Sequence, residues 1–247
     1  MKEVSDLLGE RYGIREKLAV HQVDAWEKVS NNFRVRFARK GVDFVYHLRK
    51  NIQKITIEPI QRANDAMAHL SLTGVKVPYR YIANLDGKSI SEYNGSLWQL
   101  GEFIEGEHFS GSMEQLTCCA IEIAHMHTAF CSLRLKDPPP RISASFDNLS
   151  DIYDKVLQGD SSLKLKKELL AGEGLVRKAL SEVLALQPED EHQVQVVHGN
   201  LHPLNFIFDA KENSKLLAII DFGDMYTGPL LQDIGNALHR LVRRSVE

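Results

Sequence analysis

The chain has few cysteines and no long apolar run, and both absences narrow its class. Its three cysteines are Cys118, Cys119 and Cys131, and two of them are adjacent. An odd count with this spacing argues against a disulfide framework and favours a reducing, cytoplasmic compartment. No apolar run approaches the length of a membrane span, and the charged stretch 1–6 is unlike a secretory signal peptide.

Neither sign of charge is in large excess. The chain carries 30 Lys and Arg against 33 Asp and Glu, for a net charge of -3 and a pI of about 6.4. This balance indicates neither a nucleic-acid partner nor a membrane surface. The hydrophobic share of 43% and the charged share of 26% are ordinary for a globular protein. A chain of 247 residues buries a full core, as one large domain or as two lobes.

The most informative stretch lies in the last quarter of the chain. Apolar runs at 194–197, 206–208 and 216–220 have the length and composition of short buried strands. The polar segment 211–215 supplies a turn between the last two runs. His-Gly-Asn-Leu-His-Pro-Leu-Asn follows the first run at 198–205, and Asp-Phe-Gly follows the third at 221–223. The polar residues of both segments are therefore expected in loops at strand ends.

These segments resemble the catalytic core of the aminoglycoside phosphotransferase and choline kinase family, small-molecule kinases distantly related to protein kinases. The family pattern is His-Gly-Asp, four residues and Asn, then, after a short hairpin, apolar-apolar-Asp-Phe or Asp-Trp. The spacing is kept, but Asn200 stands where the family has its catalytic-base Asp. The resemblance implies an α+β, two-lobed, protein-kinase-like fold. Residues 1–103 are expected to form a β-rich nucleotide-binding lobe, and 104–247 a mostly helical lobe with the catalytic loop and magnesium site.

Kinase chemistry gives each matching residue an expected role. One carboxylate accepts the proton of the substrate hydroxyl, an Asn five residues on binds magnesium, and a second Asp bridges magnesium to the phosphates. By resemblance, Asn200 with His198 occupies the catalytic position, and Asn205 and Asp221 hold Mg²⁺. An asparagine is no general base near neutrality, and a missing base costs about 10²–10⁴ in rate. Slow turnover can survive on positioning and electrostatics, and Asn200→Asp is expected to raise it.

The resemblance also implies contacts to the nucleotide, ATP or GTP. Alternation at 33–37 and 44–49 around Lys40-Gly41 predicts a hairpin. The basic residue that ends its second strand contacts the phosphates in relatives. Here it is Arg49, with Lys50 on the opposite face as the fallback.

Glycine is absent from 29–33, where relatives place a phosphate loop. The side chains of Ser30 and Asn32, or backbone N–H groups, are expected to meet the phosphates there. The stretch 98–106 resembles the family's hinge, whose backbone binds adenine, so Glu102, Phe103 and Ile104 are candidate contacts.

Further helices are expected at 4–13, 60–72, 113–130 and 233–243, and strands at 77–83 and 96–104. Relatives place a Glu on the 60–72 helix to pair with the basic strand residue. Here Asp65 is the sole acid inside, and Glu58 precedes it. His127 is expected to be a satisfied core histidine, and Asp233 to begin a helix and steady the catalytic loop. The segment 146–186 is helix-prone, with a joint at 172–174, and in relatives it helps to build the acceptor pocket.

The implied function is Mg²⁺-dependent transfer of phosphate from ATP or GTP to a hydroxyl of a small molecule. An alternative is a nucleotide-binding pseudokinase with a protein partner, which Asn200, the missing helix Glu and the early C-terminus favour. A scaffold that binds no nucleotide is disfavoured because Asn205 and Asp221 are retained. A hydrolytic transition-metal site of His198, His202 and Asp221 is disfavoured too, because Gly199 and Pro203 deny the two histidines a helical spacing and no third histidine lies nearby in the sequence.

Overall fold

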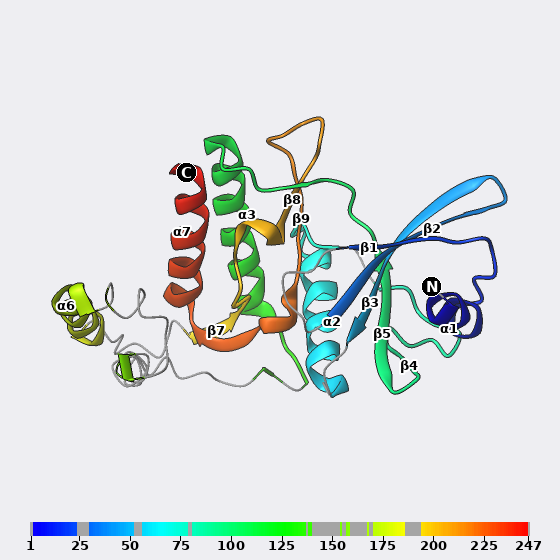
Figure 1. Cartoon of the computed structure of the whole chain (residues 1–247), viewed down its shortest axis with the longest axis horizontal. Coiled ribbons are helices and arrows are strands. Elements are labelled where there is room, and N and C mark those ends of the chain that lie inside the picture. Colours follow the sequence, from blue (N-terminus) through cyan, green and yellow to red (C-terminus); the bar gives the residue numbers. More distant parts are fainter. Residues whose placement is uncertain are drawn as a thin grey trace.

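The computed structural model of the chain describes residues 2–23, 30–51, 56–78, 81–136, 138–139, 154, 157–158, 167, 170–185 and 194–246. The N-terminal strands gather on one side and the C-terminal helices on the other, with helix α2 (Ile57–Leu72) between them (Figure 1). Within the described residues, no helix is long and apolar enough to cross a membrane.

An antiparallel sheet of five strands dominates the N-terminal side, in the order β1-β2-β3-β5-β4. The predicted hairpin is present, because the turn residues Lys40 and Gly41 have φ of 52° and 78°, as a type I′ hairpin turn requires. Its strands extend beyond the alternating segments. The five strands are β1 (Ala19–Val23), β2 (Ser30–Arg39), β3 (Val42–Asn51), β4 (Ser91–Tyr93) and β5 (Ser96–Glu102).

Helix α1 (Lys2–Tyr12), close to the predicted 4–13, packs against this sheet. Every second side chain along a strand points to the same face of the sheet, so residues two apart pack into the same core. The buried members of this first core are Val4, Leu7, Leu8, Tyr12, Ile14, Val35, Phe37, Leu48, Trp98 and Leu100.

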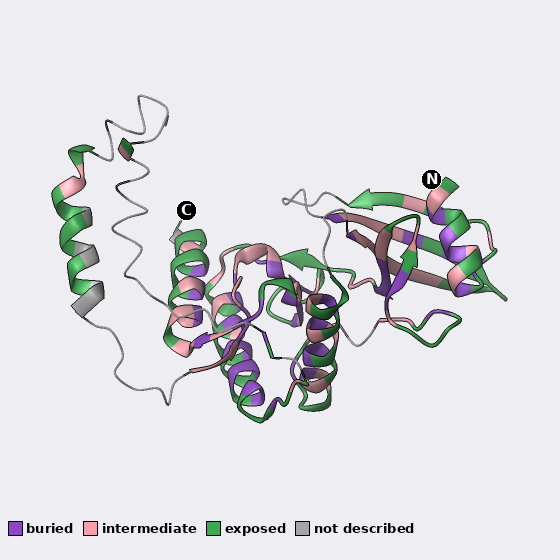
Figure 2. Ribbon diagram, turned by 90° about the horizontal axis from the view of Figure 1, so that it is seen from below, coloured by how far each residue is buried: buried purple, intermediate pink, exposed green. Residues whose placement is uncertain are grey.

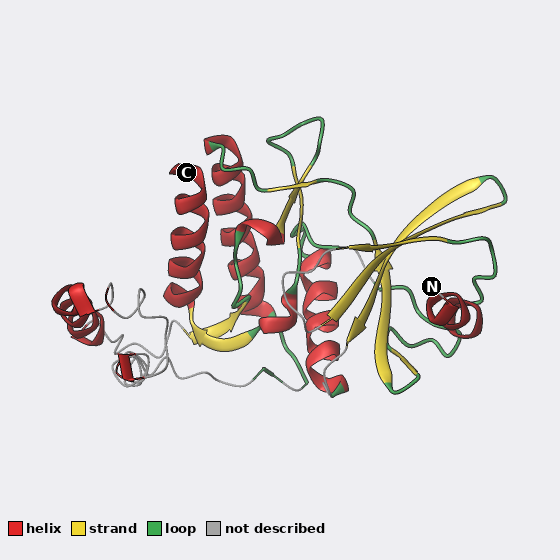
Figure 3. Cartoon of the chain, in the orientation of Figure 1, coloured by secondary structure: helices red, strands yellow, loops and turns green. Residues whose placement is uncertain are grey.

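A second core joins α2 to α3 (Met113–Ser132) and α7 (Leu230–Val246). Two small sheets lie beside these helices (Figure 3). One pairs β7 (Val194–Val197) with β10 (Tyr226–Pro229), and the other has the order β6-β8-β9. Those strands are β6 (Glu107–His108), β8 (Phe206–Phe208) and β9 (Leu216–Ile219).

Buried residues line the inner sides of α2, α3 and α7 (Figure 2). Helix α2 thus contributes Ala66, Met67 and Leu70 to the second core, although it precedes residue 103. The boundary between 103 and 104 stays a prediction.

Several predicted elements differ from the structure. Helix α2 begins at Ile57 rather than at residue 60, because Pro59 is tolerated in a first turn that needs no N–H. Glu58 therefore lies inside the helix. The strand predicted at 77–83 is wrong for the residues that the structure describes there, 77–78 and 81–83: Tyr81 forms an isolated bridge to Gly101, and Pro78 cannot donate to a ladder. The strand predicted at 96–104 ends at Glu102.

Much of the helix-prone segment 146–186 lies outside the described residues. Within it, α6 spans Glu173–Ala185. Gly174, expected in a loose joint, lies inside this helix.

Candidate active site

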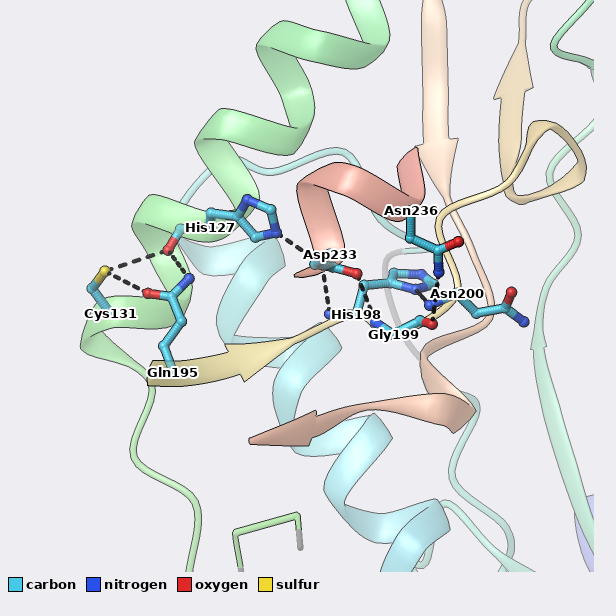
Figure 4. Close-up of polar contacts among 8 residues, drawn as sticks. All are labelled: His127, Cys131, Gln195, His198, Gly199, Asn200, Asp233 and Asn236. Carbon is cyan, nitrogen blue, oxygen red and sulfur yellow. Dashed lines mark hydrogen bonds and ion pairs between the residues drawn. The ribbon is translucent and has the colours of Figure 1, made fainter. Parts of the chain in front are cut away.

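Asp233, in the first turn of α7, holds the loop that follows β7 (Figure 4). Its carboxylate is 1% exposed and accepts hydrogen bonds from His127 Nε2 at 2.8 Å and from the backbone N–H groups of His198 at 3.1 Å and Gly199 at 3.0 Å. Three donors satisfy a carboxylate that would otherwise be costly to bury. The structural roles predicted for Asp233 and for His127 agree with these contacts.

Gly199 lets this loop pass close to the segment after β9. Its φ is 81°, a conformation that glycine adopts without strain. A Cβ atom at this position would collide with the carbonyl oxygen of Asp224 and crowd the ring of Tyr226. The two loops are therefore held in direct contact, and Gly199 is required there.

His198 links the same two loops. Its buried ring places Nε2 3.0 Å from the carbonyl oxygen of Ile220, and Nδ1 accepts from the N–H of Asn200 at 3.2 Å. The ring also packs on Phe222, with centroids 4.6 Å apart. Burial lowers the pKa of His198, which keeps the ring neutral. Both ring nitrogens of His198 are therefore engaged within the protein, and its catalytic role stays a prediction.

Asn205 and Asp221 lie at neighbouring ends of the β8–β9 hairpin, where Phe206 pairs with Ile219. The Nδ2 group of Asn205 donates to the carbonyl oxygen of Asn200 at 2.8 Å, so its Oδ1 is the amide atom suited to a cation. Asp221 adopts the left-handed conformation, with φ 65° and ψ 66°. Such conformations are uncommon outside glycine and concentrate at functional sites.

One carboxylate and one amide oxygen fit Mg²⁺, which keeps several waters and binds through one or two carboxylates plus phosphate oxygens. In the part of the chain that the structure describes, no group of three or more His, Cys, Asp or Glu side chains is arranged to hold a metal. Both ring nitrogens of His198 are hydrogen-bonded within the protein, which argues against their use as transition-metal ligands.

The predicted strand phase of β3 agrees with the geometry. Arg49 Nη1 lies 3.3 Å from Asp221 Oδ1. Lys50 points the other way, with Nζ 2.8 Å from the carboxylate of Glu3 and 4.9 Å from the centre of the Trp98 ring. The side chains of Arg49 and Lys50 therefore lie on opposite faces of the sheet. Asp65, on α2, accepts instead from Gln61 Nε2 at 2.8 Å, so the ion pair of Arg49 is made with Asp221.

Ser30 and Asn32 do not form a turn. They begin β2, with Ser30 opposite Asn51 and Asn32 opposite Arg49, so residues 30–33 form a strand where relatives place a phosphate loop, and contacts of Ser30 and Asn32 with phosphates stay a prediction. The Oδ1 atom of Asn32 lies 2.9 Å from His47 Nε2, and its Nδ2 lies 3.4 Å from Ser30 Oγ. Because β2 pairs with β3, these residues lie in the strand next to Arg49.

His47 predicts a measurable pH dependence. Burial, followed by the Arg49 cation, lowers its pKa from 6.5 to about 4. Between these values the unfolded chain binds more protons than the folded one, so stability falls as pH drops from 6.5 to 4, by up to about 1.4 kcal/mol per pH unit. Denaturant unfolding of the unmodified chain and of His47→Gln at pH 7 and pH 4.5 checks this. The stability advantage of His47 should shrink at pH 4.5; an equal advantage at both pH values would contradict it.

The hinge candidates connect the two sides of the molecule. Glu102 ends β5, and Phe103 and Ile104 follow it before β6. The guanidinium of Arg34 lies 5.1 Å from the centre of the Phe103 ring and pairs with Glu105. Contacts of these residues with a nucleotide base stay a prediction.

The surroundings of Asn200 were not foreseen from the sequence. Its Nδ2 group donates to Asp224 Oδ2 at 2.8 Å, and Arg240 Nη1 lies 3.4 Å from its Oδ1. The sequence does contain one signal for Asp224, because this second acid directly follows Asp-Phe-Gly at 221–223. Arg240 comes from α7, forty residues away in the chain, and no local pattern indicates it.

This two-lobed architecture, with Asp221 of the loop after β9 meeting Arg49 of the N-terminal sheet, is that of a kinase-like phosphotransferase. The chain belongs to the phosphotransferase enzyme family, whose model matches residues 24–247. The predicted family resemblance and the α+β kinase-like fold are confirmed. No curated protein sequence matches the chain.

Solved structures agree with this assignment. Spectinomycin phosphotransferase in complex with ADP and spectinomycin matches with a TM-score of 0.66 and 16% identity, over 100% of this chain and 78% of that one. A microcompartment-associated aminopropanol kinase matches at 0.65 and 17%, over 90% and 69%. An aminoglycoside phosphotransferase from Alicyclobacillus acidocaldarius matches at 0.64 and 17%, over 93% and 70%. At these identities the likeness establishes the fold.

Proposed function

We propose that the chain transfers the γ-phosphoryl group of ATP or GTP to a hydroxyl group of a small molecule, with Mg²⁺. The observation that carries this is the convergence of Arg49, Asn205 and Asp221 from three separate elements. Among the similar structures are spectinomycin phosphotransferase with ADP and spectinomycin, amicoumacin kinase with AMP-PNP and Ca²⁺, and a phosphotransferase with GDP and kanamycin. The chain spans 65% of the amicoumacin kinase.

The proposed roles follow from the side-chain chemistry. Asn205 Oδ1 and the carboxylate of Asp221 would hold Mg²⁺, which neutralises phosphate charge when bound. Arg49 presents a fork of N–H donors suited to phosphate oxygens, beside Ser30 and Asn32 at the start of β2. Main-chain groups at 102–104 would receive the base of the nucleotide. The acceptor would approach the loop at 198–205.

A nucleotide-binding pseudokinase is the second candidate, and Asn200 in the base position favours it. An assay of ADP or GDP release separates the two. It uses Mg-ATP and Mg-GTP with a panel of hydroxylated acceptors: spectinomycin, aminoglycosides and amino alcohols. Acceptor-stimulated release, with a phosphorylated product seen by mass spectrometry, would support the phosphotransferase. Nucleotide binding without stimulation by any acceptor would favour the pseudokinase.

Arg49→Ala is expected to weaken Mg-ATP binding more than about tenfold, because a hydrogen bond to a charged group contributes roughly 1.5–3 kcal/mol. Lys50→Ala is the matched control: its side chain lies on Glu3 at the opposite face, so affinity should change less than about twofold. Titration calorimetry of both variants with Mg-ATP measures the two affinities. The reverse order would show that Lys50 is the phosphate contact.

A further inference from the structure

Asn200 is held at both ends of its side-chain amide. A carboxylate accepts hydrogen bonds and a guanidinium donates them, so the Nδ2 group must face Asp224 and Oδ1 must face Arg240. The distances are 2.8 Å to Asp224 Oδ2 and 3.4 Å to Arg240 Nη1. Donor meets acceptor on each side, and the pair of Asn200 with Asp224 is chemically complementary.

An aspartate at position 200 would break this complementarity. Its carboxylate would face that of Asp224 at hydrogen-bond distance, and two carboxylates so close cannot both stay ionised. One carboxylate next to one amide is therefore the favoured arrangement at neutral pH. The chain has that arrangement, but with the carboxylate on Asp224 instead of on residue 200.

Asp224 is also well placed to meet a substrate. It closes the short 3-10 helix Phe222–Asp224 directly after Asp221, and its backbone touches the loop at Gly199. Its side chain is exposed, whereas Asp233, the other acid that contacts this loop, is buried under three donors. A carboxylate has about four lone-pair sites, so the hydrogen bond from Asn200 leaves it able to accept a proton.

We propose that Asp224 is a catalytic residue: the general base that takes the hydroxyl proton of the acceptor, with Asn200 and Arg240 orienting it. The inference rests on the proposed phosphotransferase function. The acceptor oxygen forms a bond to the γ-phosphorus while its proton passes to the Asp224 carboxylate. The bond from the γ-phosphorus to the bridging oxygen breaks, its electron pair leaves with the nucleoside diphosphate, and Asp224 later returns the proton to water.

A cycle of four proteins tests this assignment, with hydrolysis of Mg-ATP as the readout and water as the acceptor. They are the unmodified chain, Asp224→Asn, Asn200→Asp and the double variant that exchanges the two residues. Asp224→Asn should hydrolyse ATP about 10²–10⁴ times more slowly. The exchanged double variant should recover activity, because it restores one carboxylate and one amide in reversed order. Asn200→Asp alone should stay below the double variant at pH 7, because its two carboxylates compete for one proton.

Controls separate chemistry from folding. Calorimetric Mg-ATP affinities should match across the four proteins, which shows that each is folded, and Asp65→Asn, an exposed acid on α2 bonded to Gln61, should hydrolyse ATP at the unmodified rate. Equal hydrolysis by Asp224→Asn and the unmodified chain would overturn the role of Asp224 and leave the proposed function standing. Mg-ATP binding without hydrolysis by any of the four would also overturn it. Failure of the unmodified chain to bind Mg-ATP would instead overturn the proposed function.

Discussion

Replacing Asp233 with alanine is expected to lower the unfolding midpoint by about 10 °C. The carboxylate is buried and joins its own helix, α7, to two other elements: to α3 through His127, and to the loop after β7 through the N–H groups of His198 and Gly199. Each buried donor left without its acceptor costs about 1–3 kcal/mol, and Asp233→Ala leaves three such donors. In a chain of this size each kcal/mol shifts the midpoint by about 2–4 °C. Differential scanning calorimetry measures the shift.

The control for this prediction is Asp43→Ala. Asp43 also makes an ion pair, with Arg36 at 2.6 Å, but both side chains are exposed. Removing this pair should therefore lower the unfolding midpoint far less. The unfolding midpoint of Asp233→Asn should lie near that of Asp233→Ala, because an amide NH₂ group would face N–H donors. A midpoint for Asp233→Ala as high as that of Asp43→Ala would contradict the anchoring role.

Asp221→Ala is expected to abolish stabilisation by Mg-ATP. Ligand at 100 times its dissociation constant stabilises the folded state by about 2.7 kcal/mol, a rise of several degrees in the midpoint of the unmodified chain. Asp221 is the single carboxylate of the proposed metal site, and alanine supplies no oxygen ligand. The measurement is the ligand-induced shift within each variant, because alanine is also strained in the left-handed conformation of residue 221.

Asp221→Asn and Asp86→Ala serve as controls. Asparagine tolerates the left-handed conformation, so Asp221→Asn isolates the lost charge and should also give a strongly reduced shift. Asp86, an exposed acid 3.7 Å from Arg11, should leave the Mg-ATP shift unchanged. A full shift in Asp221→Ala would place the nucleotide elsewhere.

The parts of the site that the sequence predicted are those governed by short-range patterns. The apolar runs of β7, β8 and β9 stand at their predicted positions, and Asn205 and Asp221 meet because an antiparallel hairpin joins their strands. Alternation in β3 also predicted that Arg49 and Lys50 would part to opposite faces, as they do.

The parts that escaped prediction depend on contacts between distant segments. Tyr81 is of a residue type that is common in strands, but it forms only an isolated bridge to Gly101. Ser30 and Asn32 lie where relatives have a phosphate loop, yet ten-residue pairing of β2 with β3 places them in the sheet. Likewise Asn200 is defined by Asp224 and Arg240, which reach it from a later loop and from α7. Sequence periodicity carries no information on such contacts.

The proposed function depends on Mg²⁺-dependent nucleotide binding at Arg49, Asn205 and Asp221. Isothermal titration of the unmodified chain with ATP, once with excess Mg²⁺ and once with EDTA, tests this most directly. Binding with Mg²⁺ that weakens more than about tenfold in EDTA is the expected result, because the two oxygen ligands act through the metal. No heat of binding at millimolar Mg-ATP or Mg-GTP, or equal affinity with and without Mg²⁺, would contradict the account.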